Sequence, residues 1–235
     1  MFGLPTPTPL DLRFSLFGVP VWISAWHWLG ALFFGFYMLP PNLAGATLAA
    51  HLAMAALCIF VSLLLHEMGH ALTARVFGMD WAVVLLAFGG FAYGRRPSRI
   101  RWWQDVLIAL AGPFVQLALA LLLVVGITTV PIFLDGGIDS ALALTALNVL
   151  MWVNVAWPVL NLLPIHPLDG GQVLRAILGR TMRRGADLWT ARVGFFVAVM
   201  VGATLYVQFH ALYGAVLFGY LAMQNFQVMQ AIGNR

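Results

Sequence analysis

Long apolar runs, broken by proline, glycine and arginine, recur along most of this 235-residue chain. A helix needs about 20 consecutive apolar residues to cross a bilayer. Six stretches approach that length, at about residues 21–39, 43–77, 102–126, 141–163, 189–208 and 211–229. Charged residues make up only 9% of the chain, against about 25% in soluble domains. The pattern predicts an all-α polytopic membrane protein with about six transmembrane helices.

Two shorter segments favour β-hairpins at the membrane surface. Residues 12–21 alternate in polarity and break at Gly18, just before the first span. Residues 80–94, between the second and third spans, are too short and too rich in glycine to cross. We expect there a hairpin that turns at Gly89-Gly90 and dips into the membrane beside the functional site. All these elements are expected to form a single domain over residues 1–235, with its core at about 43–171 and the last two spans within 189–229.

The arginines predict how the spans are oriented. The chain has no lysine, and most of its arginines gather at one set of loops, at Arg13, Arg75, 95–101 and 175–184. The loops near residues 40, 135 and 210 contain none. By the positive-inside rule, both termini lie in the cytoplasm. The net charge of +4 therefore reflects topology. The expected surroundings are a lipid bilayer, and no nucleic-acid partner is predicted.

One polar motif interrupts the second apolar span. It reads His66-Glu67-Met68-Gly69-His70, and Glu67 is the only glutamate in the chain. Residues four apart share one face of a helix, so both imidazoles can bind the same metal ion. Such groups are costly inside a membrane helix and mark a functional site. We predict His66 and His70 as metal ligands and Glu67 as the base that acts on a water activated by the metal.

A catalytic zinc takes three protein ligands and keeps one position open. Asp169 is the best candidate for the third, because it follows the fourth span at the depth predicted for the motif. His166, three residues earlier, is the rival. Asn161, eight residues before Asp169, is a neutral donor suited to stabilising a developing oxyanion. The remaining aspartates lie in loops or at interfaces and are expected to be solvated.

Together these motifs resemble the site-2 proteases, zinc metalloproteases that cut within membranes. Residues 66–70 match the family's His-Glu-x-x-His, and residues 161–170 match its Asn-x-x-Pro and Leu-Asp-Gly elements at the same spacing. Ala111-Gly112-Pro113 matches a Gly-Pro in the third helix, and residues 88–91 match the Gly-rich hairpin. Gln116 stands where an asparagine often follows the Gly-Pro. No PDZ or CBS domain fits the chain, which looks like a minimal member.

The resemblance implies one Zn²⁺ per chain, held by His66, His70 and Asp169, with Glu67 as the base and Asn161 as a transition-state stabiliser. It implies an integral protein of a bacterial or archaeal cell membrane. Its substrate would span or be anchored in that membrane, often as a regulator such as an anti-sigma factor cut in regulated proteolysis. Two alternatives are a metal-binding transporter or sensor and a catalytically inactive relative. A transporter should spread polar residues along a path through the bilayer, whereas here they collect at one depth.

Overall fold

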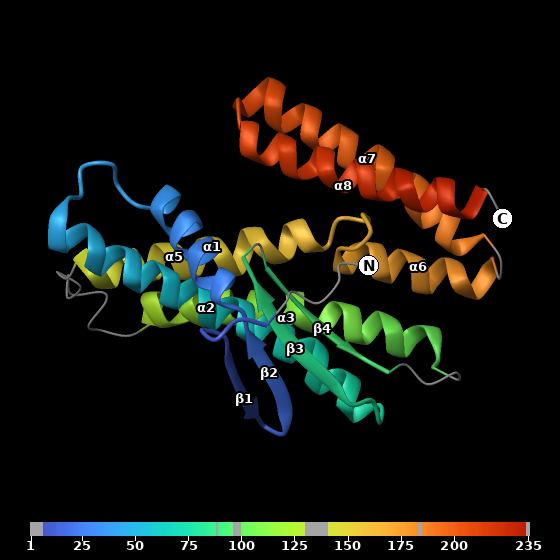
Figure 1. Cartoon of the computed structure of the whole chain (residues 1–235), viewed down its shortest axis with the longest axis horizontal. Coiled ribbons are helices and arrows are strands. Elements are labelled where there is room, and N and C mark those ends of the chain that lie inside the picture. The colour runs from blue at the N-terminus through green and yellow to red at the C-terminus, as the bar shows by residue number, and fades with distance from the viewer. Residues whose placement is uncertain (1–6, 88, 96–99, 130–140, 183–184, 234–235) are drawn as a thin grey trace. The chain divides into compact units, whose positions relative to one another are not determined.

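The computed structural model describes residues 7–87, 89–95, 100–129, 141–182 and 185–233. Within these ranges the chain is mostly helical and carries one small sheet (Figure 1). The chain divides into two compact units. The first comprises residues 1–97 and 111–158, and the second comprises residues 98–110 and 159–235.

The sheet of the first unit is built from two hairpins. Its strands are β1 (Leu12–Leu16), β2 (Val19–Ile23), β3 (Trp81–Leu86) and β4 (Gly89–Gly94). Each hairpin is antiparallel, and β2 pairs with β3 in parallel, so the order is β1-β2-β3-β4 (Figure 1). Strand β3 is buried through Val83, Val84 and Leu85. Such a continuous apolar run is typical of a strand that is covered on both faces.

A hairpin occupies each of the two segments predicted from the sequence, but two boundaries differ. Strand β2 continues to Ile23, because the alternation of buried side chains extends past Val21. The first helix therefore begins at Ala25. The second turn lies between Leu86 and Gly89, whereas the prediction placed it at Gly89-Gly90. Both glycines belong to β4, opposite the last residues of β3. Association of the hairpins with the membrane stays a prediction.

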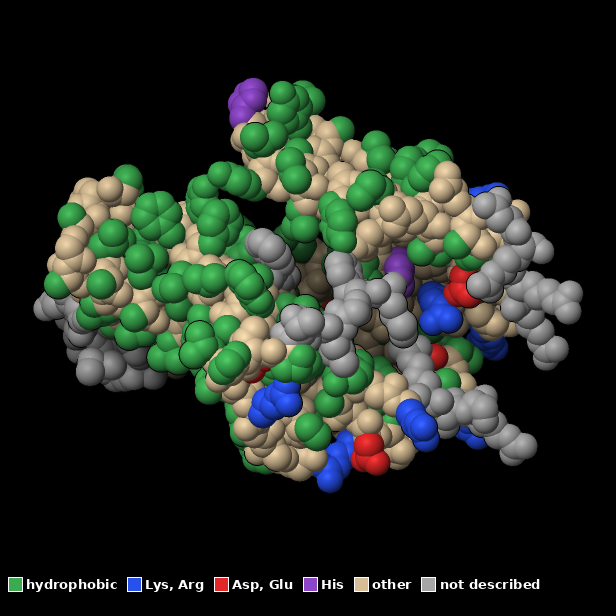
Figure 2. Space-filling model, in the orientation of Figure 1, with side chains coloured by type: hydrophobic (Ala, Val, Ile, Leu, Met, Phe, Trp, Pro, Cys, Tyr) green, Lys and Arg blue, Asp and Glu red, His purple; other side chains and the backbone are tan. Residues whose placement is uncertain are grey.

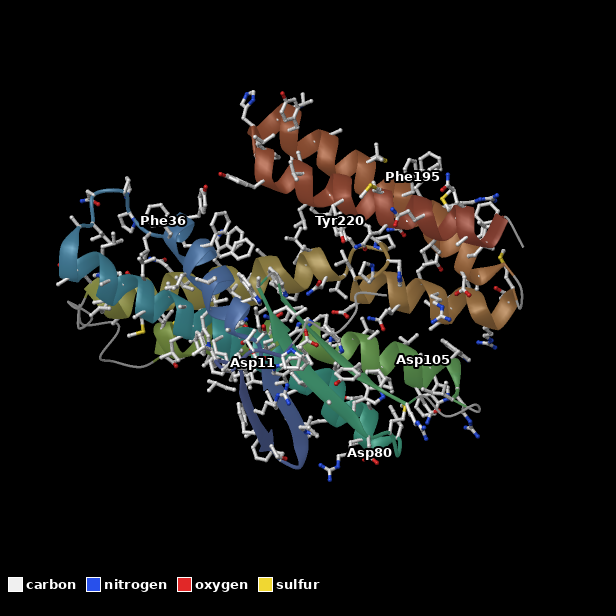
Figure 3. All side chains as sticks on the ribbon, viewed as in Figure 1. Asp11, Phe36, Asp80, Asp105, Phe195 and Tyr220 are labelled. Carbon is white, nitrogen blue, oxygen red and sulfur yellow. The ribbon has the colours of Figure 1, made fainter. Side chains whose placement is uncertain are left out.

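Long helices make up the rest of the first unit. They are α1 (Ala25–Met38), α2 (Gly45–Val76), residues 111–129 of α3 (Trp102–Thr129) and residues 141–158 of α5 (Ala141–Asn161). Asp11 fixes the start of α1, since its carboxylate accepts a hydrogen bond from the amide of Ala25 at 2.9 Å (Figure 3). Helix α2 has 32 residues. Its length of ~48 Å exceeds the ~30 Å of the hydrocarbon core.

The second unit contains α6 (Asp169–Thr181), α7 (Ala186–Phe209) and α8 (Leu212–Gly233), together with residues 102–110 of α3 and the end of α5. Helices α7 and α8 form a hairpin that turns at His210, whose φ of 50° is left-handed. Its core joins Ala198, Phe218 and Ile165, the last from the loop before α6. Many hydrophobic side chains of this hairpin are exposed, and they are visible on its face in Figure 2, which is typical of a surface in lipid.

The sequence pattern does not predict helix α6, because Gly170 and Gly171 at its start favour a loop. Both glycines are buried. A Cβ atom on Gly170 would collide with the carbonyl oxygen of Leu162, and one on Gly171 would lie 2.5 Å from that of Ile165. The two glycines therefore serve the close packing of the helix start against the preceding loop.

Four helices within the described ranges are long and apolar enough to cross a membrane, namely α2, α3, α5 and α7. They coincide with the second to fifth predicted spans and indicate an integral membrane protein. Helix α1 has only 14 residues, and α8, with 22 residues, is not among the four. The count of six spans and the single domain stay predictions. The predicted loop near residue 135 lies outside the described residues.

Candidate metal centre

Helix α2 carries the two histidines that the sequence predicts as metal ligands. One turn apart, they bring Nε2 of His66 to 3.1 Å from Nε2 of His70. Both imidazoles are buried, as is Glu67. Two N–H groups cannot point at each other across this distance, so at least one of the two nitrogens presents its lone pair.

The separation of these nitrogens fits a tetrahedral zinc ion. Zn–N bonds of about 2.0–2.1 Å at a tetrahedral angle place two ligand nitrogens roughly 3.3 Å apart, close to the observed 3.1 Å. The two rings are inclined at 80° with centroids 4.8 Å apart, so they converge and do not stack. Neutral imidazole is also among the preferred ligands of zinc.

Helix α3 leaves space beside the two nitrogens, because it presents a glycine there. A Cβ atom on Gly112 would lie 2.8 Å from Nε2 of His66 and closer still to Nε2 of His70. The helices approach backbone to backbone at this level, since a Cβ on Gly69 of α2 would lie 2.9 Å from the carbonyl oxygen of Ala111. The space at Gly112 is therefore one that a single methyl group would fill.

One turn after Gly112, the buried Gln116 accepts a hydrogen bond from Nδ1–H of His66 at 2.8 Å. Its amide nitrogen donates to the carbonyl oxygen of Ser62 at 3.4 Å, and the Ser62 hydroxyl accepts from Asn154 at 2.8 Å. Asn154 thus makes the interhelical hydrogen bond expected of a membrane asparagine. Sequence reasoning assigned no function to Gln116. Its spacing of four from Gly112 is the signal that places both on one helix face.

Strand β4 approaches Glu67 through a glycine. A Cβ atom on Gly90 would lie 2.8 Å from Cγ of Glu67 and 3.0 Å from the carbonyl oxygen of Val84. The absence of a side chain at Gly90 therefore brings the backbone of an edge strand against the only glutamate of the chain. The Gly-rich hairpin predicted beside the motif does lie beside this residue.

Asn161 and Asp169 belong to the second unit and stand at the two ends of one loop. Asn161 is the last residue of α5, and Asp169 is the first residue of α6 and is buried. The loop between them is held from α8, where the amide of Asn225 donates to the carbonyl oxygen of His166 at 2.7 Å. The roles predicted for Asn161 and Asp169 stay predictions.

His166 has surroundings of its own within the second unit. It lines a pocket of about 230 Å³ with Arg175 and Asp187, which form an ion pair at 2.5 Å. Burial lowers the pKa of His166, and the positive charge of Arg175 lowers this pKa further, while Asp187 opposes the shift. The net shift favours the neutral imidazole. Whether His166 binds the metal in place of Asp169 is not tested by these contacts and stays a prediction.

Comparisons with known proteins relate this chain to zinc metalloproteases. The model of peptidase family M50 matches residues 54–139 and 130–201. A protein of Synechocystis sp. that is named as a zinc metalloprotease is 31% identical over 227 residues, covering 90% of this chain and 57% of that protein. A zinc metalloprotease of Methanocaldococcus jannaschii is 34% identical over 123 residues, covering 52% of this chain and 33% of that protein. The chain thus spans between a third and three fifths of the length of these two relatives.

The fold has a counterpart among solved structures. The site-2 protease from Methanocaldococcus jannaschii superposes with a TM-score of 0.58 at 20% identity, covering 93% of this chain and 95% of that one. At this level of identity, the likeness speaks for the fold alone. The two chains thus share a similar fold although their sequences differ at most aligned positions.

Proposed function

We propose that this chain, which belongs to peptidase family M50, is an intramembrane zinc endopeptidase. It hydrolyses a peptide bond within or near the transmembrane segment of a membrane protein. The observation that carries the proposal is the pair of Nε2 atoms of His66 and His70, 3.1 Å apart on an apolar helix of membrane-spanning length. Two relatives are named as zinc metalloproteases, which supports both zinc as the metal and peptide hydrolysis as the reaction.

His66, His70 and Asp169 hold one zinc ion per chain in this proposal. Zinc, when bound, supplies Lewis-acid activation of the attacking water. The two histidines have the geometry for such an ion, and Gly112 leaves the space. The burial of Asp169 supports its role as the third ligand, because a buried carboxylate requires a cation or hydrogen-bond donors.

Glu67 acts as the general base. Its carboxylate takes a proton from the attacking water and later delivers it to the leaving nitrogen of the cleaved peptide. The burial of Glu67 supports this role, because the proton is then exchanged with the substrate and not with bulk solvent. The side-chain amide of Asn161 donates a hydrogen bond to the oxyanion that develops on the scissile carbonyl.

The edge strand β4 offers a way to hold the substrate. A peptide bond inside a helix is shielded, so a substrate segment must unwind before it is cut. An extended segment can add to the free edge of a sheet through main-chain hydrogen bonds. Such pairing at β4 would hold the segment next to Glu67, since Gly90 of this strand lies against that residue.

The substrate class follows from the membrane setting. The substrate is a transmembrane or membrane-anchored protein, such as an anti-sigma factor or a similar regulator, and the cut is part of regulated proteolysis. The chain resides in a bacterial or archaeal cell membrane with both termini in the cytoplasm. The clustering of arginines at alternate loops supports this orientation.

The test replaces Glu67 by Gln and follows cleavage of a membrane substrate, with the zinc content measured in parallel. Because the variant keeps all three proposed ligands, we expect normal zinc content and a loss of cleavage of at least a thousandfold. Cleavage that persists in Glu67→Gln would refute the role of the base. A wild-type chain that holds no zinc would refute the proposal as a whole, and transport without cleavage would favour the alternative class.

A further inference from the structure

The side chain of Gln116 is fully buried in the first unit and touches a histidine that is a proposed ligand. It lies on α3, fifty residues along the chain from His66, and its Oε1 atom is 2.8 Å from Nδ1 of that histidine. Burial of an amide costs free energy unless its polar atoms are hydrogen-bonded. An apolar side chain would otherwise suit this buried position, so the presence of an amide that contacts His66 needs an explanation.

The orientation of the amide follows from its second partner. The carbonyl oxygen of Ser62 is only an acceptor, and it faces the amide nitrogen of Gln116 at 3.4 Å. The amide oxygen must therefore face His66. An amide oxygen cannot donate, so Nδ1 of His66 carries a proton and donates it. In the neutral ring, the lone pair is then on Nε2, the nitrogen that faces His70.

We propose that Gln116 is a positioning residue that holds His66 in the tautomer and ring orientation needed to bind the metal. This inference rests on the proposed zinc peptidase function. Metal-binding histidines commonly donate their other ring N–H to a partner that fixes the ring. Here the partner is Gln116 of α3, which contacts His66 of α2. Gln116 is itself held by α2, because its amide nitrogen donates to the backbone carbonyl of Ser62.

The neutral charge of Gln116 suits the surrounding charges. Zinc carries two positive charges, and Asp169 and Glu67 carry one negative charge each, so the proposed centre is neutral in total. A carboxylate at position 116 would orient His66 equally well but would add a buried negative charge. Burial of a net charge in an apolar interior is costly. The amide therefore supplies the oriented acceptor without that cost.

The experiment measures zinc affinity by competition with a chelator, at one fixed pH, on the full-length chain in detergent. Gln116→Met keeps length and volume but removes the acceptor, and Gln116→Glu restores an acceptor. Asn154→Leu is the control, because Asn154 is also a buried amide bonded to Ser62, but its amide nitrogen donates to Ser62 and Leu150 and not to His66. The absorption spectrum of the Co²⁺-loaded protein reports ligand geometry independently of affinity.

We expect zinc affinity to fall about 10- to 100-fold in Gln116→Met, the range for loss of such partners, with an altered Co²⁺ spectrum. Gln116→Glu should bind at least as tightly as wild type, and Asn154→Leu should stay within about threefold of it. The inference is overturned if Gln116→Met also stays within threefold, if Gln116→Glu is as weak as Gln116→Met, or if Asn154→Leu loses as much affinity. Zinc binding by wild type in the same assay separates these outcomes from a failure of the proposed function.

Discussion

Replacing Gly112 by Ala tests most directly whether the two histidines form a metal centre. The added methyl carbon would lie 2.8 Å from Nε2 of His66 and 2.7 Å from Cε1 of His70, within the space where the ion would bind. Overpacking by a methyl group costs about 1–3 kcal/mol. If the full cost of about 3 kcal/mol reduces the binding free energy of zinc, the zinc affinity falls about 100-fold. We expect that loss in a chelator competition, with cleavage reduced to the same extent.

A matched control lies on the same helix. A Cβ atom on Gly126 would meet nothing within 4 Å, so Gly126→Ala should keep the zinc affinity and cleavage of wild type. Thermal unfolding of the metal-free proteins should show that Gly112→Ala still folds. The reasoning would be refuted if folded Gly112→Ala bound zinc within threefold of wild type, because the space beside the histidines would then have no bearing on the metal.

Three further substitutions test other contacts. Gly90→Ala should lower cleavage at least tenfold with zinc content unchanged, because its Cβ would lie 2.8 Å from Cγ of Glu67; full activity would contradict the close approach of β4. Asn225→Leu should lower the free energy of unfolding by about 1–3 kcal/mol, since it leaves the carbonyl of His166 without its donor, and an unchanged melting temperature would argue against this. Hydrogen bonds to its carboxylate, of which the one from the Thr8 hydroxyl has the largest effect, hold the pKa of Asp11 well below its ordinary value of 3.8. Its stabilising effect is therefore complete above about pH 4 and declines below it. Asp11→Asn should be less stable than wild type at pH 7 and approach it as the pH falls, and a constant difference would exclude the linkage.

The sequence predicts the parts of the site that depend on local spacing. His66 and His70 are four residues apart on a helix, so their convergence follows from helical geometry alone. The four helices that are long and apolar enough to cross a membrane could be predicted for the same kind of reason, because length and composition define them. The contact of Gln116 with His66 could not, since it depends on how α3 packs against α2.

The misplaced turn and the helix that was not predicted share a physical cause, which is that a glycine has more than one structural use. Gly89-Gly90 indicates a turn, yet both residues lie in β4, where Gly90 allows a close approach to Glu67. No helix is predicted at Gly170-Gly171, yet both residues start α6, where neighbouring carbonyl oxygens leave no space for a side chain. Whether a glycine serves backbone conformation or close packing depends on tertiary neighbours, which local sequence does not reveal.

The parallel pairing of β2 with β3 places Val21 to Ile23 beside Val83 to Leu85. Strands that share hydrogen bonds lie on the same side of a bilayer, so the chain between them must cross an even number of times. Helix α2 is long and apolar enough to supply one crossing. In the predicted topology of six spans, the return crossing falls to α1 and the residues that flank it, although α1 has only 14 residues. In this topology, a chain that inserted α2 without α1 would leave its two hairpins on opposite sides of the membrane. Strands β2 and β3 could then not pair, so formation of the sheet would depend on the insertion of both helices.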